Sequence, residues 1–408
     1  MGVLGILFAI AVAYALSAAR AAIRWRTLAW GVGLQLLLGV LVLRTPVGRL
    51  FEALGIGFNR FISLAEEGTR FVFGELGRSE NGVIFAFQIL PLIIVVSCIS
   101  AMLYHLGILQ KVVAVLAWVM QRGMRASGAE SLNVAVNLFL GQAEAPLTIR
   151  PYLAAMTRSE LMTVMTSGMA TVSGAILIAY VQLGGAEAEN LITAVVMTAP
   201  ACIMLAKIFE PETGQPETMG WIPEQETAKD GNILDAAARG TVEGLQMALQ
   251  VGAMVLVFVA LISIVNGILA GIQGIVGWSW LPASVQAILG PIFAPVAWLL
   301  GVPWSDAPTV GNLLGTRMAL NELVSFAELA QLKDSLQPQS FLIANYALCG
   351  FANVGSVGIM IGALGAMLPD RRRELAALGM RAMLAATLSN FMTASVAGLI
   401  ALTPILEA

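Results

Sequence analysis

The chain has 408 residues, of which 58% are hydrophobic and only 12% are charged, with a formal net charge of −3. Soluble domains carry about a quarter charged residues, so this composition excludes an ordinary soluble protein and indicates an integral membrane protein. No basic stretch suits nucleic acid. The apolar runs predict about eight transmembrane helices, near residues 2–19, 28–43, 83–103, 160–183, 190–209, 243–270, 341–369 and 375–403.

Residues 1–130 are predicted to form scaffold helices and an interfacial connector. The first two spans contain almost no polar side chains. A cleaved signal peptide usually begins with basic residues, and none precedes the first span, so we expect this span to be retained. Residues 46–81 alternate charged and apolar turns, which is typical of amphipathic helices at a membrane surface.

Residues 131–209 are predicted to form a first transport repeat. The segment 131–157 is apolar but is interrupted by a polar cluster at Gln142 and Glu144, and basic residues flank both of its ends. Because basic residues favour the cytoplasmic side, this segment is predicted to be a re-entrant helical hairpin rather than a span. Small and polar residues at 168–174 then predict a break in the following helix.

The second half of the chain repeats this pattern after a polar connector. Residues 210–240 are predicted to be a cytoplasmic connector, since about 30 charged and turn-forming residues cannot bury a core. Residues 241–304 are expected to supply a scaffold helix and an interfacial helix. Residues 305–408 are predicted to form the second transport repeat, with a hairpin at 305–331, a broken helix around 350–356, and a last span.

Each repeat places a carboxylate, Glu144 or Glu322, about 25 residues before its helix break. Two such units in matching positions are typical of a transporter built from inverted repeats. Basic residues cluster after the first span, around the first hairpin, in the connector and between the last two spans. The positive-inside rule therefore places both termini outside, and the two hairpins enter from opposite sides.

Glu144 and Glu322 are the strongest candidate functional residues, because a carboxylate at membrane depth is costly without a partner or a role. The alternative is a structural carboxylate satisfied by hydrogen bonds. The amides of Gln142, Asn321 and Asn353 can donate and accept, and Asn with Glu can bind vicinal hydroxyls. Few Arg or Lys residues lie near the hairpin tips, so we expect a neutral polar substrate.

The sequence has few ligands for a transition metal but several for a hard cation. His105 is the only histidine, and the three cysteines lie inside apolar runs, so a zinc or iron site is not expected. The side chains of Asn137 and Thr171 and the carbonyls near Leu140 and Val172 could supply oxygen ligands to sodium. The alternative for these side chains is hydrogen bonding between helices.

Three motifs in order carry a resemblance to a known family: GQAEAPLTIRPYL at 141–153, ALNELVSF at 319–326 and CGFANVGSVGI at 349–359. The chain resembles the concentrative nucleoside transporter family over nearly its whole length. Members are sodium- or proton-coupled nucleoside importers that form homotrimers with a scaffold and a moving transport domain. The resemblance implies an all-α, multi-pass protein of the bacterial inner membrane, in contact with lipid. It implies no enzyme activity and no cofactor besides a coupling ion.

The resemblance also implies roles for individual residues. The substrate-binding residues come from both repeats: Gln142, Glu144 and Ile176 at the nucleobase, Glu322, Asn353 and Ser356 at the ribose, and Phe351 lining the pocket. The sodium ligands are the side chains of Asn137 and Thr171 and the carbonyls of Leu140 and Val172. The family commonly has a hydroxyl residue where this chain has Ala143, so the sequence leaves the base preference open.

These features together predict a sodium-coupled symporter that imports a nucleoside, for example uridine, by an elevator-type movement. Asn137 and Thr171 favour sodium, and proton coupling is the alternative. A rival of another class is an intramembrane enzyme with Glu144 and Glu322 as an acid and base, but the sequence supplies neither a nucleophile beside a base nor a metal set. A passive channel is a further rival, against which two occluding hairpins argue.

Overall fold

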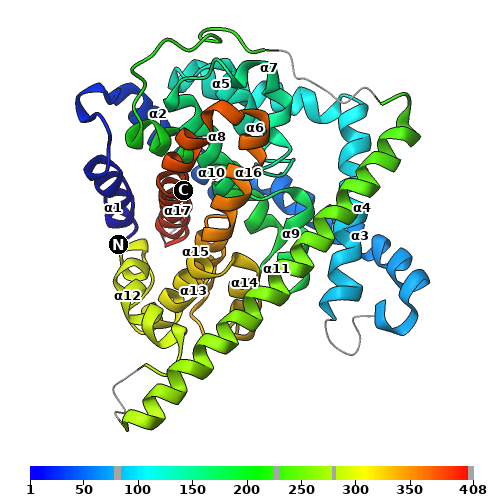
Figure 1. Ribbon diagram of the computed structural model, residues 1–408, viewed down its shortest axis with the longest axis vertical. Helices are drawn as coiled ribbons and strands as arrows, with labels where there is room; N and C mark the ends of the chain where they lie inside the picture. Colours follow the sequence, from blue (N-terminus) through cyan, green and yellow to red (C-terminus); the bar gives the residue numbers. More distant parts are fainter. Residues whose placement is uncertain (78–83, 224–229, 278–281, 403–408) are drawn as a thin grey trace.

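The computed structural model describes residues 1–77, 84–223, 230–277 and 282–402 (Figure 1). Within these ranges the chain is helical and contains no strand. The helices in chain order are α1 (Gly2–Ala15), η1 (Arg20–Ala22), α2 (Trp25–Arg44), α3 (Gly48–Phe73), η2 (Gly74–Gly77), α4 (Phe85–His105), α5 (Ile108–Met124), α6 (Gly128–Val136), η4 (Ala145–Ile149), α7 (Arg150–Leu153), α8 (Arg158–Ala170), α9 (Gly174–Gln182), α10 (Ala188–Phe209), α11 (Ile233–Val276), α12 (Val285–Leu300), α13 (Ala307–Ala319), α14 (Glu322–Gln331), α15 (Pro338–Leu348), α16 (Val354–Met367), η5 (Pro369–Arg371) and α17 (Arg372–Leu402).

Six helical segments of the described chain are long and apolar enough to cross a bilayer: Trp25–Arg44, Phe85–His105, Arg158–Gln182, Ala188–Phe209, Ile233–Val276 and Pro369–Ala401. The prediction of about eight spans also counted two regions that the structure divides or shortens. One is α1, which has 14 residues, and the other is the α15–α16 pair, which is broken in its middle. The prediction of an all-α integral membrane protein is confirmed.

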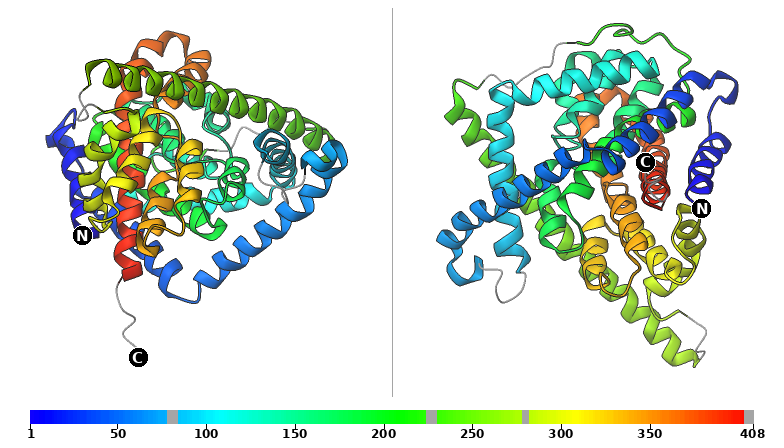
Figure 2. Two further views of the ribbon diagram at one scale, coloured as in Figure 1. Left: turned by 90° about the horizontal axis from the view of Figure 1, so that it is seen from below. Right: turned by 180° about the vertical axis from the view of Figure 1, so that it is seen from behind.

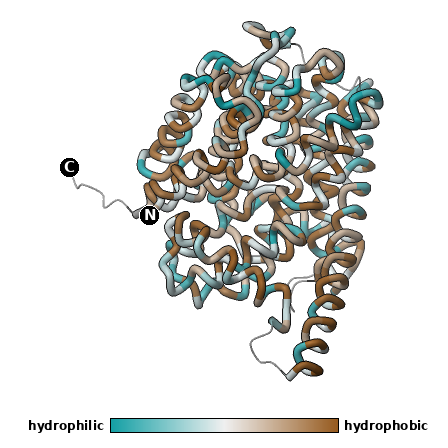
Figure 3. The backbone as a smooth tube through the Cα atoms, turned by 60° about the vertical axis from the view of Figure 1, so that its left-hand side comes forward, coloured by the Kyte–Doolittle hydropathy of each residue, from teal (hydrophilic) through white to brown (hydrophobic). Residues whose placement is uncertain are grey.

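Helices α3, α4 and α11 form an outer frame along one side of the molecule (Figures 1 and 2). None of the most apolar 18 residues of α11 is buried, whereas 94% of the corresponding window of α8–α9 is. Figure 3 shows that α11 is hydrophobic along most of its length. Most apolar side chains of α11 therefore face the surroundings of the chain rather than its core, whereas α4 contributes Ile89, Leu92 and Ile93 to the core.

Helix α17 runs through the centre of the remaining helices (Figure 2) and packs against α8, α10, α15 and α16. Its contact surface is built from small residues, and Ala385, Ala386, Ser389 and Ser395 are all buried. Small side chains let helix backbones approach closely in an apolar environment. This central helix reaches both of the helix breaks that form the site.

Helix α11 begins at Ile233, inside the segment 210–240 that was expected to be a connector. The reason is a helix cap, because the Asn232 side-chain oxygen accepts hydrogen bonds from the backbone nitrogens of Leu234 and Asp235, each at 3.0 Å. The helix therefore starts in the polar segment, about ten residues before the apolar run.

The amphipathic connector at 46–81 is mostly one helix, α3, which has 26 residues. Residues 78–81 of that segment lie outside the described residues. Its position at a membrane surface stays a prediction.

Candidate functional site

The first hairpin is fixed at its base by two capping boxes. At the start of α6, Glu130 Oε1 accepts from the Ser127 nitrogen at 2.7 Å, and at the start of α8, Glu160 Oε2 accepts from the Thr157 nitrogen at 2.8 Å. The two boxes are joined, since the Ser127 hydroxyl donates to Glu160 Oε1 at 2.5 Å. The hairpin and the first broken helix therefore begin at a fixed position relative to each other.

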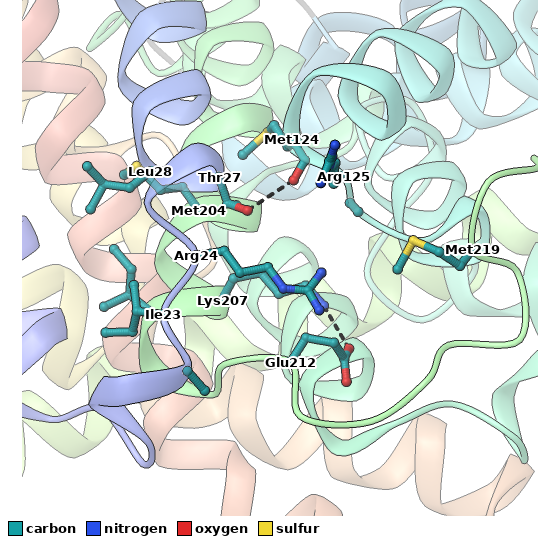
Figure 4. A pocket seen from close by; sticks show the side chains of 13 residues that line it. Ile23, Arg24, Thr27, Leu28, Met124, Arg125, Met204, Lys207, Glu212 and Met219 are labelled. Atoms are coloured by element: carbon teal, nitrogen blue, oxygen red, sulfur yellow. Dashed lines mark hydrogen bonds and ion pairs between the residues drawn. The ribbon is translucent and has the colours of Figure 1, made fainter.

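Lys207, near the end of α10, pairs with two carboxylates of this buried cluster. Its Nζ lies 2.9 Å from Glu130 Oε2 and 3.2 Å from Glu212 Oε2. Burial opposes ionisation of Glu212, but Lys207 and the hydrogen bonds to that carboxylate outweigh it and lower the pKa of Glu212 below its ordinary value. Figure 4 shows both residues beside a cavity of about 20 Å³, with Arg24 and Arg125 at its edge. That volume holds about one water molecule, which is too small for a substrate. We therefore interpret this cluster as a structural one that holds the starts of α6 and α8 against α10.

The tip of the first hairpin lies between α6 and η4 and carries Gln142 and Glu144. A Cβ atom at Gly141 would collide with Glu144 Oε2, so glycine allows that carboxylate to turn back over the tip. Gln142 is buried, and its Oε1 atom has no hydrogen-bond partner among the described residues. A buried acceptor without a partner is costly, and it suits a site whose ligand supplies the donor.

The first helix break separates α8 from α9 at residues 171–173, as predicted. The Asn137 Nδ2 atom donates to the Ser167 carbonyl at 2.7 Å and to Thr171 Oγ1 at 2.5 Å, which brings the hairpin and the break together. Asn137 Oδ1 is buried and has no partner within the described chain. Leu140 and Val172 both lie outside helices, one in the hairpin turn and one in the break. The four predicted sodium ligands therefore belong to two adjoining irregular segments.

The second helix break separates α15 from α16 at residues 349–353, again as predicted. Asn353 caps α16, since its Oδ1 accepts from the Ser356 nitrogen at 2.9 Å and from the Ser356 hydroxyl at 3.2 Å. Its Nδ2 donates to Glu322 Oε2 at 2.9 Å. Glu322 is the first residue of α14 and is 1% exposed. This chain of bonds joins the second hairpin to the second break.

One cavity of about 120 Å³ lies between both hairpin tips, both breaks and α11. All seven residues predicted to bind substrate line it: Gln142, Glu144, Ile176, Glu322, Phe351, Asn353 and Ser356. Residues from positions more than 200 apart in the chain thus meet around one space. The cavity combines carboxylates, amides and a hydroxyl with an aromatic ring, which suits a neutral ligand that has both a flat and a hydroxylated part.

Sequence reasoning missed the wall of the cavity that α11 supplies, formed by Met247, Gln250, Val251, Met254 and Phe258. In the sequence these residues belong to the apolar run 243–270, which predicts a transmembrane helix without a binding role. The only available signal was Gln250, a polar residue inside that run.

Sequence reasoning also missed a polar cluster behind the cavity. Arg317 of α13 is fully buried and donates to the carbonyls of Ala347, at 2.7 Å, and Gly350, at 3.2 Å. A third bond, of 2.5 Å, joins Arg317 Nη2 to Asn390 Oδ1 on α17. The signal for Asn390 was an amide in the last apolar span, with no irregularity near it in the sequence.

Comparison with known proteins adds a family match along the chain. The profile for the N-terminus of Na⁺-dependent nucleoside transporters matches residues 4–76, the one for their C-terminus matches residues 190–398, and a profile described as nucleoside recognition matches residues 86–187.

Two curated relatives illustrate the range of similarity. The uncharacterized transporter YutK of Bacillus subtilis is 40% identical over 98% of both chains. Sodium/nucleoside cotransporter 1 of Rattus norvegicus is 39% identical, and the match covers 93% of this chain but only 60% of that longer protein.

Solved structures are also similar over almost the whole chain. CNTnw in an inward-facing substrate-bound state has a TM-score of 0.91 and 41% identity, covering 98% of this chain and 97% of that one. Outward-facing and intermediate states of CNTnw variants match about as well, with TM-scores between 0.90 and 0.92.

Proposed function

Because this chain belongs to the family of Na⁺-dependent nucleoside transporters, we propose that it is a symporter that imports nucleosides with sodium. The family consists of transporters rather than enzymes. The observation that carries the proposal is the single cavity around which both hairpin tips and both helix breaks place their polar side chains.

The ribose end of the nucleoside binds at Glu322, Asn353 and Ser356. Asn353 already donates to Glu322 Oε2, which orients a carboxylate that lines the cavity and can accept from ribose hydroxyls there. Hydrogen bonds to an ionised acceptor are roughly twice as strong as neutral ones. This arrangement favours a ligand with adjacent hydroxyl groups over a free base.

The base end binds between the first hairpin tip and the second break. The unpartnered Oε1 atom of Gln142 can accept from the base, and Glu144 lies two residues further along the hairpin tip. Ile176 and Phe351 supply apolar surface for a flat ring. Ala143 offers no hydroxyl, so base recognition rests on the two polar neighbours.

Sodium binds at the first break, through the Asn137 and Thr171 side chains and the Leu140 and Val172 carbonyls. The fit is supported by the unpartnered buried Oδ1 of Asn137, because a hard cation needs such oxygen atoms. Entry of one sodium ion down roughly 100 mV supplies about 2.3 kcal/mol, enough for more than tenfold accumulation of the nucleoside.

Transport follows an elevator-type mechanism, in which residues 131–209 and 305–408 move against a scaffold of residues 1–130 and 241–304, with residues 210–240 connecting the repeats. The two repeats are inverted, which is supported by the placement of α6 and α7 at one end of the molecule and of α13 and α14 at the other (Figure 1). The protein lies in the bacterial inner membrane with both termini outside.

The protein assembles as a homotrimer, with lipid around the remaining surface. The exposed apolar side chains of α11 suit either neighbour, because lipid and a second copy of the chain both offer apolar contacts.

Uptake of radiolabelled uridine into proteoliposomes tests the function. We expect saturable accumulation under an imposed sodium gradient and none when choline replaces sodium. Uptake driven only by a proton gradient would refute the sodium site while leaving nucleoside transport intact. Flux without saturation would indicate a channel and refute symport.

A further inference from the structure

We propose that Asn390, held by Arg317, is a positioning residue that couples sodium binding to nucleoside binding by tying the two helix breaks together. The inference rests on the proposed function, and it assigns a coupling role to two side chains that touch neither ligand.

The first step is that Asn390 bonds both breaks at once. Its Nδ2 atom donates to the carbonyl of Ala170 at 2.7 Å and to the carbonyl of Cys349 at 2.8 Å. Ala170 is the last residue of α8, directly before Thr171 and Val172 of the sodium site. Cys349 opens the second break, which ends at Asn353 of the ribose site.

The second step is that Arg317 fixes Asn390 and the second break from the hairpin side. It donates to Asn390 Oδ1 and to the carbonyls of Ala347 and Gly350. Arg317 lies on α13, and the hairpin tip that follows carries Glu322. Arg317 and Asn390 together thus satisfy four carbonyls that the broken helices leave free, those of Ala170, Ala347, Cys349 and Gly350.

The third step is that the two breaks are in close contact at this point. A Cβ atom at Gly350 would lie 2.6 Å from the Ala170 carbonyl oxygen, so only glycine allows this approach. Between them lies Asn390, which is 0% exposed. A displacement of Ala170 therefore also displaces the backbone around Gly350, because buried and closely packed groups move together.

The consequence for function is a coupling free energy. Ion ligation at Thr171 and Val172 fixes the backbone next to Ala170, and the Asn390 bonds fix the backbone that orients Asn353. Each ligand then favours the arrangement that the other requires, and this effect must be reciprocal. Removing the amide should abolish the mutual effect and leave the contacts of each ligand in place.

The experiment measures uridine affinity by equilibrium binding to the purified full-length protein, with choline alone and with saturating sodium. For Asn390→Ser we expect the sodium-dependent gain in affinity to fall by at least about tenfold, with affinity in choline changed less than twofold. Asn345→Ser is the matched control, since Asn345 is equally buried but donates to Phe341 in its own helix, at 2.9 Å. We expect that control to keep the wild-type gain.

Two results would overturn the proposal: an unchanged gain in Asn390→Ser, or an equal loss of affinity with and without sodium, which indicates a structural role only. If wild-type protein shows no sodium-dependent gain at all, the proposed sodium coupling fails, and this inference fails with it. The two failures are therefore distinguishable.

A second variant and a wild-type measurement cover the case in which Asn390→Ser does not fold. Arg317→Lys keeps the charge but lacks the fork that reaches three acceptors, and we expect the same loss of gain. In the wild type, sodium without nucleoside should slow hydrogen exchange in residues 349–354. Protection confined to residues 137–173 would overturn the proposal without any variant.

Discussion

Replacing Glu322 by Gln tests the assignment of the ribose site most directly. The carboxylate is buried, and Asn353 already donates to its Oε2 atom at 2.9 Å. Gln keeps the shape, and its one oxygen can still accept from Asn353, but its NH2 group then faces the ribose. The charge-assisted bonds that two ribose hydroxyls donate to the carboxylate are thereby replaced by neutral bonds that those hydroxyls accept. Each exchange costs about 1 to 2 kcal/mol, so two cost roughly 2 to 4 kcal/mol, which is a 30- to 700-fold loss of uridine affinity.

Binding is measured at saturating sodium with uridine and with 2′,3′-dideoxyuridine, which lacks both hydroxyls. We expect Glu322→Gln to lose affinity for uridine and to bind the dideoxy compound as the wild type does. Glu328→Gln is the control variant, because Glu328 is a partly buried carboxylate on the same helix that does not line the cavity. An equal loss for both compounds, or no loss for uridine, would refute the ribose assignment.

Three other perturbations address the ion site, the contact between the two helix breaks and the buried ion pairs at the base of the first hairpin. Asn137→Ala should raise the sodium concentration for half-maximal uptake by about tenfold, with the loss of one oxygen ligand, and an unchanged sodium dependence would exclude Asn137 as a ligand. Gly350→Ala should lower the melting temperature, measured by thermal denaturation in detergent, because its Cβ would lie 2.6 Å from the Ala170 carbonyl oxygen; wild-type melting would contradict that contact. Lys207→Met leaves buried carboxylates without their cation and should cost about 3 to 5 kcal/mol of stability, so a variant that melts like the wild type would show that Lys207 is not needed there. Because the pKa of Glu212 is lowered on folding, its ionised form stabilises the wild type above the unfolded-state value near 4.5, and that contribution should disappear as the pH falls through the lower folded value. On acidification, the melting temperature should fall more steeply in the wild type than in Lys207→Met. Equal slopes in the two proteins would contradict this pairing.

The sequence was sufficient for features that interrupt a local pattern. Glycine and polar residues inside apolar runs identify both helix breaks, and the carboxylates Glu144 and Glu322 identify both hairpin tips, because each is unexpected in its own segment. The seven substrate residues that the family resemblance implies all line one cavity. Their roles in binding stay predictions.

Features that depend on distant partners could not be found in this way. Asn390 lies in a regular helix rich in small residues, and its partners are 41, 73 and 220 positions away. The α11 wall of the cavity is made mostly of apolar residues that any membrane helix could carry. The start of α11 is a different case, because its capping residue Asn232 is a local signal. Many other polar residues surround Asn232, and the segment was therefore predicted to be a connector.

The burial of Arg317 has a consequence for how the chain is made. Arg317 lies in the last turn of α13, and a charged side chain inside a membrane protein is costly until its partners are in place. Asn390, one of its partners, emerges from the ribosome 73 residues later. The second hairpin therefore gains its full set of hydrogen bonds only after the last helix has been synthesised.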